Sequence, residues 1–196
     1  MSELSVVPVE PRHSDALVSL FERTGSPCYC RYWHFEGDKN AWLDRCANRP
    51  EDSQEELRRA LEAGSLSGVV AFAGETLVGW MKLAPAASVP KLFEQRMYKG
   101  LPCFSGDRQR AYVIGCFLVD EGWRSRGVAD ALLRGGLELA RSAGARSVEA
   151  FPRRVEGVPA EQLWTGPISI FERAGFRVVT ELCPYPVLRI ELAEAQ

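Results

Sequence analysis

The sequence lacks a long apolar run and any large excess of one charge. Its longest apolar stretch, YVIGCFLV at 112–119, is far shorter than the roughly 20 residues that a membrane-spanning helix needs. The formal net charge is only -2 at pH 7, which gives no general attraction to nucleic acid or to an acidic membrane. The first residues also lack the basic and apolar regions of a signal peptide. We therefore expect a cytoplasmic protein that binds neither nucleic acid nor membrane.

Cysteines are too few to suggest a disulfide scaffold. The chain of 196 residues has six, and thiols stay reduced in a cytoplasm. Cys28, Cys30, His34 and Cys46 lie close together in the sequence, which leaves a structural zinc site as an alternative. Their C-x-C opening is not the usual zinc-finger spacing, however. We expect no metal, and cysteines that are partly buried free thiols.

The chain also lacks repeats, low-complexity tracts and an obvious interdomain linker. Its length suits one compact domain, and its 46% hydrophobic content is ordinary for a globular core. The sequence therefore predicts a single domain over residues 1–196.

In the first half of the chain, apolar periodicity and turn residues predict alternating strands and helices. Strands are expected at 4–10, 67–74 and 76–85, and helices at 11–25 and 48–64. The aromatic-rich and cysteine-rich stretch SPCYCRYWHFEGDKNAW (26–42) has no clear period, so we expect it to form an ordered loop.

The second half is expected to contain a central strand, two helices and a closing pair of strands. Residues 111–119 are apolar at both alternations, which is typical of a strand covered on both faces, and Gly115 within it suggests a bulge or a close backbone approach. The further expected elements are a short helix within 89–97, a helix at 127–142, a strand at 146–152, a helix at 166–173, and strands at 176–182 and 185–192. The whole is one mixed α/β domain.

The stretch GWRSRGVADALL (122–133) combines two arginines and a glycine with the start of a helix. The first amides of a helix have no internal partner, and the helix dipole makes this end partly positive. Gly127 leaves the backbone open to a phosphate, while Arg124 and Arg126 add charged donors. The motifs G-x-x-x-x-G-K-[ST] and G-x-G-x-x-G are both absent. This pattern predicts a phosphate site, with a solvated helix start as the alternative.

The longer stretch CFLVDEGWRSRGVADALL (116–133) resembles the signature of the GNAT superfamily of N-acetyltransferases, in which a strand precedes [Q/R]-x-x-G-x-[G/A] and a helix. The later IFERAGF (170–176) resembles a second feature of that family, and the resemblance covers roughly 111–182. It implies an α+β fold with a central mixed, mostly antiparallel sheet of about six to seven strands flanked by helices.

The resemblance implies acetyl-CoA as co-substrate, bound by strand, loop and helix within 111–144. In the family, the strand backbone pairs with the pantetheine arm, which maps onto Phe117, Leu118 and Val119. The pyrophosphate cradle maps onto Arg124, Ser125, Arg126, Gly127, Val128 and Ala129. The implied chemistry is direct attack of an amine on the thioester, whose carbonyl the amide of Val119 would polarise.

Two positions depart from the family pattern. Many members place a carboxylate on the strand where this chain has Gly115, Cys116 and Phe117, and many have a tyrosine acid at the position of Phe171. The sequence therefore supports the cofactor site better than any acid or base.

A lysine-like amine needs a base, because only about one molecule in a thousand or fewer is neutral at pH 7. Glu149 is the first candidate, since it interrupts the apolar strand SVEAFP and burial there would raise its pKa. The alternative is that Glu149 is paired with an arginine or faces a wet groove. His34 is the second candidate. Cys116 as an acyl-enzyme nucleophile is a weaker one, and a weakly basic amine needs no strong base.

The acceptor is expected to enter over residues 26–66, where the aromatic loop supplies Tyr29, Tyr32 and Trp33. The alternative is that these rings only cap the core. The leading interpretation is an N-acetyltransferase for a small-molecule amine, acting as a monomer or homodimer. Two alternatives remain: an acyltransferase of the same fold that uses longer acyl chains or hydroxyl acceptors, and a non-catalytic acyl-CoA-binding module.

Overall fold

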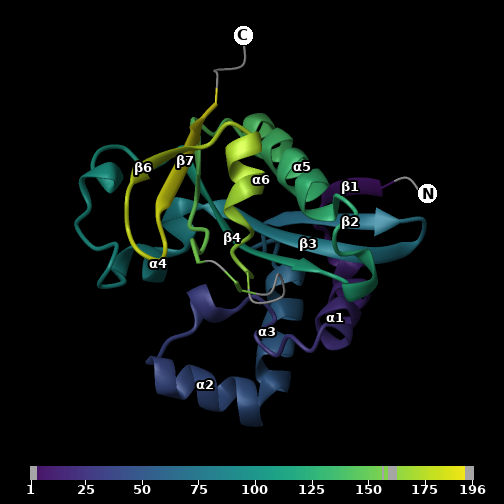
Figure 1. Cartoon of the computed structure of the whole chain (residues 1–196). Coiled ribbons are helices and arrows are strands. Elements are labelled where there is room, and N and C mark those ends of the chain that lie inside the picture. The colour runs from purple at the N-terminus through teal and green to yellow at the C-terminus, as the bar shows by residue number, and fades with distance from the viewer. Residues whose placement is uncertain (1–3, 156, 159–162, 193–196) are drawn as a thin grey trace.

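A computed structural model describes residues 4–155, 157–158 and 163–192 of the chain, and in it seven strands form one sheet (Figure 1). The strands are β1 (Leu4–Pro8), β2 (Gly68–Ala73), β3 (Thr76–Pro85), β4 (Ala111–Val119), β5 (Ser147–Ala150), β6 (Arg177–Thr180) and β7 (Val187–Glu191). Their order is β1-β2-β3-β4-β5-β7-β6, and every neighbouring pair is antiparallel except β4 and β5. The predicted mixed, mostly antiparallel sheet is confirmed.

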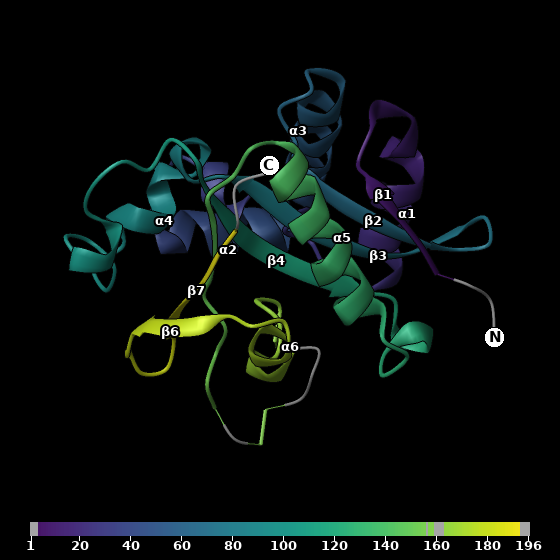
Figure 2. The ribbon, with the colours of Figure 1, turned by 90° about the horizontal axis from the view of Figure 1, so that it is seen from above.

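Helices cover both faces of this sheet. They are α1 (Ser14–Arg23), α2 (Lys39–Asn48), α3 (Pro50–Glu62), α4 (Pro90–Glu94), α5 (Val128–Ser142) and α6 (Ile168–Arg173). The helices α1 and α3 lie on the face opposite to α5 (Figure 1). Seen from above, α5 runs along the sheet and α6 lies beside it, toward β6 (Figure 2). Within the described residues, no helix is long and apolar enough to cross a membrane.

The core divides according to the alternation of side chains along the strands. On β3, Met81 and Leu83 point into the cluster beneath α5, whereas Trp80 points into the cluster beneath α1 and α3. Apolar burial of this kind contributes about 25 cal/mol per Å² and is the main favourable term in folding. The sheet therefore holds two apolar layers, one on each side.

Small residues let α5 lie close to the sheet. A Cβ atom on Gly135 would come within 2.5 Å of Val6 Cγ1, and one on Gly136 would overlap Met81 Cε. Gly79 of β3 has the same role from the other side, since a Cβ there would lie 2.7 Å from Val128 Cγ1. Close approach fixes the position of the α5 N-terminus, where Val128 packs against Gly79 of β3.

The element boundaries agree with the expected ranges to within a few residues, with one exception. The stretch 26–42 is expected to be a loop, but α2 begins inside it at Lys39. Its start is fixed by Asp38, whose Oδ1 accepts a hydrogen bond from Ala41 N at 2.8 Å, a standard N-cap. The helix is hard to recognise in the sequence because it has few apolar residues: Trp42 is buried, whereas the neighbouring Leu43 is 54% exposed.

Candidate functional site

The sheet opens on one side of β4. Strand β5 pairs with β4 only at Ala111–Val113, so residues 114–119 of β4 extend past the end of β5 on that edge. There, Phe117 N donates to Trp164 O at 2.6 Å. On the other edge, Asp120 N donates to Val78 O. Since backbone donors alternate between the two edges of a strand, the amide of Val119 points to the open edge, as the amide of Phe117 does.

A groove of about 290 Å³ follows this open edge and ends at the start of α5. Eight of the nine residues expected to bind the cofactor line it: Phe117, Leu118, Val119, Arg124, Ser125, Gly127, Val128 and Ala129. The other wall comes from a segment next to α6 and from α6 itself, and includes Trp164, Gly166 and Arg173. The stretch IFERAGF (170–176) covers the α6 part of this wall, but sequence reasoning did not assign it to the groove, and no motif marks Trp164 or Gly166.

The backbone at the start of α5 is arranged as an anion site requires. Gly127 is the N-cap with φ 79° and ψ 7°, and the position that a Cβ would occupy there is open space. The first turn closes with Ala131 N donating to Gly127 O at 2.9 Å. The amides of Val128, Ala129 and Asp130 therefore precede the first intrahelical bond and carry the positive end of the helix dipole.

Two arginines line the groove near this helix start, Arg124 from the loop and Arg173 from α6. Arg173 Nη2 also bonds Asp130 Oδ1 at 2.6 Å. Arg126, the ninth expected residue, is exposed and does not line the groove. Its guanidinium lies 5.3 Å from the centre of the Trp123 ring instead.

Glu149 does not line the groove. It is 0% exposed and engaged by two guanidinium groups: Arg108 binds both carboxylate oxygens at 2.8 and 2.7 Å, and Arg189 binds Oε1 at 3.1 and 2.7 Å. The Cζ atom of Arg108 lies in turn 4.6 Å from the centre of the Phe93 ring and 4.9 Å from the centre of the Phe104 ring. A carboxylate fixed in this way is poorly suited to collecting a proton, and the alternative of an arginine pair describes it better than a base.

His34 is a weak base in this structure. Burial, followed by the nearby charges of Lys82 and Arg31, lowers the pKa of His34 to about 4. Within the described residues, its buried Nε2 has no hydrogen-bond partner. The imidazole is therefore neutral at pH 7 but binds a proton only weakly.

The aromatic loop lies on the α1 side of β4, next to the groove. Tyr32 and Trp33 line a small apolar cavity of about 80 Å³, which shares Phe117, Leu118 and Trp164 with the groove. Trp33 Nε1 donates to Gly115 O at 3.3 Å, which ties the loop to β4. Tyr29, the third residue expected on the acceptor side, instead packs in the core against Phe21, with ring centroids 5.2 Å apart.

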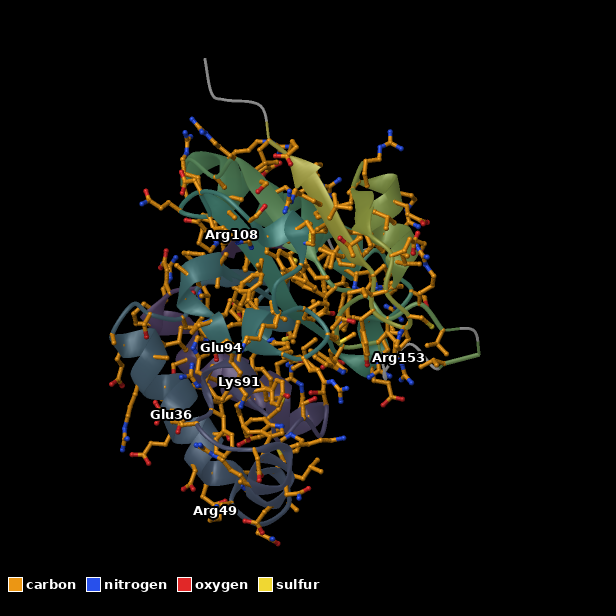
Figure 3. All side chains as sticks on the ribbon, turned by 90° about the vertical axis from the view of Figure 1, so that its left-hand side faces the viewer. Glu36, Arg49, Lys91, Glu94, Arg108 and Arg153 are labelled. Atoms are coloured by element: carbon orange, nitrogen blue, oxygen red, sulfur yellow. The ribbon has the colours of Figure 1, made fainter. Side chains whose placement is uncertain are left out.

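The outer part of this loop is held by Lys91 of α4. Its Nζ donates to Phe35 O at 2.7 Å and lies 4.8 Å from the centre of the Tyr32 ring. In the side-chain view, Lys91 and Glu36 lie on the same side of the molecule, below Arg108 (Figure 3). The loop is therefore ordered by α4 as well as by β4, a contact that the sequence does not reveal.

Comparison with known proteins agrees with this geometry. The model of the acetyltransferase (GNAT) family matches residues 29–165. No curated protein sequence matches the chain.

Solved structures of similar fold include the PaiA N-acetyltransferase of Thermoplasma acidophilum in complex with coenzyme A (11% identity, TM-score 0.56, 97% of this chain and 99% of that one). The GCN5-related N-acetyltransferase of Kribbella flavida is 19% identical (TM-score 0.57, 96% and 98%). The GNAT domain of S. lividans PAT is 21% identical (TM-score 0.58, 95% and 89%). At these identities the likeness establishes the fold alone.

Proposed function

Because the chain belongs to the acetyltransferase (GNAT) family, we propose that it transfers an acetyl group from acetyl-CoA to the amine of a small molecule by direct attack. One observation carries this proposal: the groove that joins the open edge of β4 to the start of α5. It has room for a linear cofactor with an anion at one end and a hydrogen-bonding arm along a strand. The PaiA relative was solved with coenzyme A bound, which supports the same class of cofactor here.

In the proposed complex, the pyrophosphate lies against the first amides of α5. Gly127 lets it approach the backbone, and Arg124 supplies a charge-assisted donor. Arg173 on the groove wall is paired with Asp130, so this pair adds no net charge, and Arg124 supplies the balancing cation. These contacts bind and orient the cofactor and take no part in the chemistry.

The pantetheine arm would run along Phe117, Leu118 and Val119. The amide of Phe117 already donates to Trp164 O, so the amide of Val119 is the better donor for the thioester carbonyl. A backbone N–H aimed at the developing oxyanion costs no reorganisation during the reaction and is worth about 2.7–4 kcal/mol in comparable sites.

The groups that could accept a proton from the acceptor indicate which class of amine the site suits. Glu149 is held by Arg108 and Arg189, and the low pKa of His34 makes it a weak base. Among the described residues that line the groove, Asp130 has the only carboxylate, and this carboxylate is paired with Arg173. We therefore propose a weakly basic amine, which is neutral at pH 7 and needs no strong protein base. Tyr32 and Trp33 would form its apolar seat.

The test is isothermal titration of the purified protein with acetyl-CoA. The parent should bind with micromolar affinity, and Arg124→Glu should weaken binding by about 10- to 100-fold, the loss expected when a charged hydrogen bond is removed. Gly127→Glu should abolish binding, because it places a carboxylate and a Cβ where the phosphate would lie.

The matched control is Arg134→Glu, the same charge reversal on an exposed position of α5 away from the groove. It should bind acetyl-CoA as the parent does. If the folded parent does not bind, the proposal fails. If Arg134→Glu weakens binding as much as Arg124→Glu does, the effect comes from net charge and the assigned groove is wrong. Thiol release with a panel of aromatic and alkyl amines then tests the acceptor class.

A second candidate, transfer of a longer acyl group, is favoured by the small cavity next to the groove. Its apolar walls include Cys116 and Leu118, so a few additional methylenes have a place to go. The space beside Gly115 gives no further room, since Lys82 Cδ lies 2.8 Å from where a Cβ would be. Faster thiol release from propionyl-CoA or butyryl-CoA than from acetyl-CoA would favour this second candidate.

A further inference from the structure

Two cysteines far apart in the sequence meet behind the cofactor groove. Cys30 lies in the aromatic loop and Cys116 on β4, and their Sγ atoms are 2.8 Å apart. Both side chains are buried. The sulfur atoms need to approach by less than about 1 Å to reach the S–S bond length of about 2.05 Å. The two cysteines are 86 residues apart in the sequence, and only the fold brings them together.

The aromatic loop holds Cys30 in this position. Tyr29 and Cys30 have φ values of 42° and 56°, in the left-handed region that residues other than glycine rarely adopt. Such conformations persist only where the surroundings enforce them. Tyr29 packs on Phe21, and Trp33 Nε1 bonds Gly115 O next to Cys116. Contacts on either side of Cys30 therefore hold its thiol against β4.

A buried cation lies beside the two thiols. Lys82 of β3 is the direct cross-strand partner of Cys116, and it is almost completely buried. Burial lowers the pKa of Lys82, while the two cysteines raise it. For Cys30, burial raises the pKa, but the hydrogen bond with Cys116, the charge of Lys82 and smaller effects of Trp80 and Arg31 together outweigh burial and bring the pKa to about 7. The hydrogen bond with Cys30, followed by burial, raises the pKa of Cys116 well above its usual value, so Cys116 keeps its proton.

The pair also has an approach route for a small reagent. Cys30 and Cys116 both line the apolar cavity of about 80 Å³, which Ser26 and Cys28 border as well. A thiolate-prone cysteine with a second thiol in contact, both facing a cavity, is the arrangement of a redox-active dithiol.

We propose that Cys30 and Cys116 form a redox-active dithiol site that reacts with hydrogen peroxide and closes to a disulfide. In the first step, the Cys30 thiolate attacks one peroxide oxygen: an S–O bond forms, the O–O bond breaks, and hydroxide leaves and takes up a proton. In the second step, the sulfur of Cys116 attacks the sulfur of Cys30: the S–S bond forms, the S–O bond breaks, and the Cys116 proton leaves with hydroxide as water. Two thiols lose two electrons in all, and the peroxide is reduced to two waters. A thiol reductant restores the pair.

The disulfide would join the aromatic loop covalently to β4, one residue before Phe117. It would therefore fix the wall shared by the small cavity and the groove. The site does not depend on the proposed acetyl transfer, since its reaction requires only the two cysteines and a peroxide.

The test uses the full chain, reduced and then treated with hydrogen peroxide, denatured, alkylated with N-ethylmaleimide and analysed by mass spectrometry. The six cysteines should give six adducts before oxidation and four after it, with one cross-linked peptide pair that contains Cys30 and Cys116. Five adducts after a treatment that oxidises the exposed Cys183, with Cys30 and Cys116 both alkylated, or a cross-link of Cys30 to Cys28, would overturn the proposal.

Variants assign the roles of the two sulfurs. Cys30→Ser should abolish the cross-link, whereas Cys116→Ser should leave a sulfenic acid on Cys30 that dimedone traps. The matched control is Cys28→Ser, which removes a neighbouring thiol in the same loop, one whose pKa burial raises to about 12. It should keep the cross-link. The mapped cross-link in the parent decides the question even if a variant fails to fold.

Discussion

Replacing Glu149 by glutamine tests whether this buried carboxylate stabilises the fold or serves the reaction. Glutamine keeps the size of the side chain but replaces one carboxylate oxygen by an amide NH₂. That group would face the donors of Arg108 and Arg189, which now make four hydrogen bonds to Glu149. Two guanidinium groups would then lie side by side without an anion between them.

The size of the effect follows from the burial of the three groups. Removing one partner of a buried ion pair costs about 3–5 kcal/mol. Glu149 is 0% exposed, but each arginine side chain is 21% exposed, so water offsets part of the cost and we expect about 3 kcal/mol. For a chain of this size, such a loss lowers Tm by about 6–12 °C. Urea unfolding and calorimetry of parent and variant measure both quantities.

The matched control is Glu191→Gln, since Glu191 also faces Arg189, at 3.9 Å, but is 72% exposed. An exposed pair contributes about 0–1 kcal/mol, so this variant should unfold like the parent. At a temperature where Glu149→Gln is folded, its acetyl transfer should keep the pH profile of the parent. Unchanged stability of Glu149→Gln together with a loss of activity of about 100-fold or more would refute the structural role and restore Glu149 as the base.

Two further predictions concern packing and pH. Gly136→Val should lower the free energy of unfolding by about 1–3 kcal/mol, because its Cβ would overlap Met81 Cε. The control, Arg134→Val on the exposed side of α5, should lower it by less than about 1 kcal/mol. If urea unfolding shows similar losses for both variants, the close packing of α5 is wrong. The low pKa of His34, about 4 against 6.5 in the unfolded chain, means that the unfolded chain takes up the proton first, so its contribution to stability is present above about pH 6.5 and is lost as the pH falls toward 4. NMR titration should give a protonation midpoint near pH 4 for the His34 imidazole. Between pH 6.5 and 4, His34→Gln should lose less stability than the parent. A protonation midpoint above 6 would show that the ring is solvated.

The fold was predictable because its signals are local. Alternation and apolar runs mark the strands, and glycine marks the helix ends at Gly25, Gly64 and Gly144. The strand and loop that line the groove were predictable for the same reason: they occupy two short runs of consecutive residues, and eight of the nine expected residues line one groove. Arg126 is the exception, because a long side chain in a loop can turn to either side and its neighbours decide which. Here the guanidinium turns toward Trp123.

The rest of the site depends on contacts between distant segments, and these leave no pattern in the sequence. Glu149 meets Arg108 and Arg189 from two other segments, so its apolar sequence neighbours suggest a catalytic base where the structure gives an ion pair. Trp164 closes the groove from a segment without a motif, and Arg173 lies in the stretch IFERAGF, whose position beside the groove only the fold reveals. Tyr29 resembles its aromatic neighbours in the sequence, and only tertiary packing separates it from Tyr32 and Trp33.

The bulge at Gly115 explains how one strand serves both the groove and the cysteine pair. Strict alternation would put Ile114 and Cys116 on the same face of β4. The register between β3 and β4 shifts at this point, where Leu83 faces Ile114 and Lys82 faces Cys116. Gly115 is therefore an extra residue, and Ile114 and Phe117 both join the cluster beneath α5 while Cys116 joins the opposite one.

If Gly115 continued the strict alternation of β4 instead of forming a bulge, Cys116 would point into the α5 cluster, out of reach of Cys30, and the amides of β4 beyond Gly115 would exchange edges. The same glycine thus determines that Phe117 N and Val119 N point to the open edge and that Cys116 contacts Cys30. Glycine is required because a Cβ at this position would lie 2.8 Å from Lys82 Cδ. A single position on β4 therefore links the proposed cofactor site to the proposed dithiol.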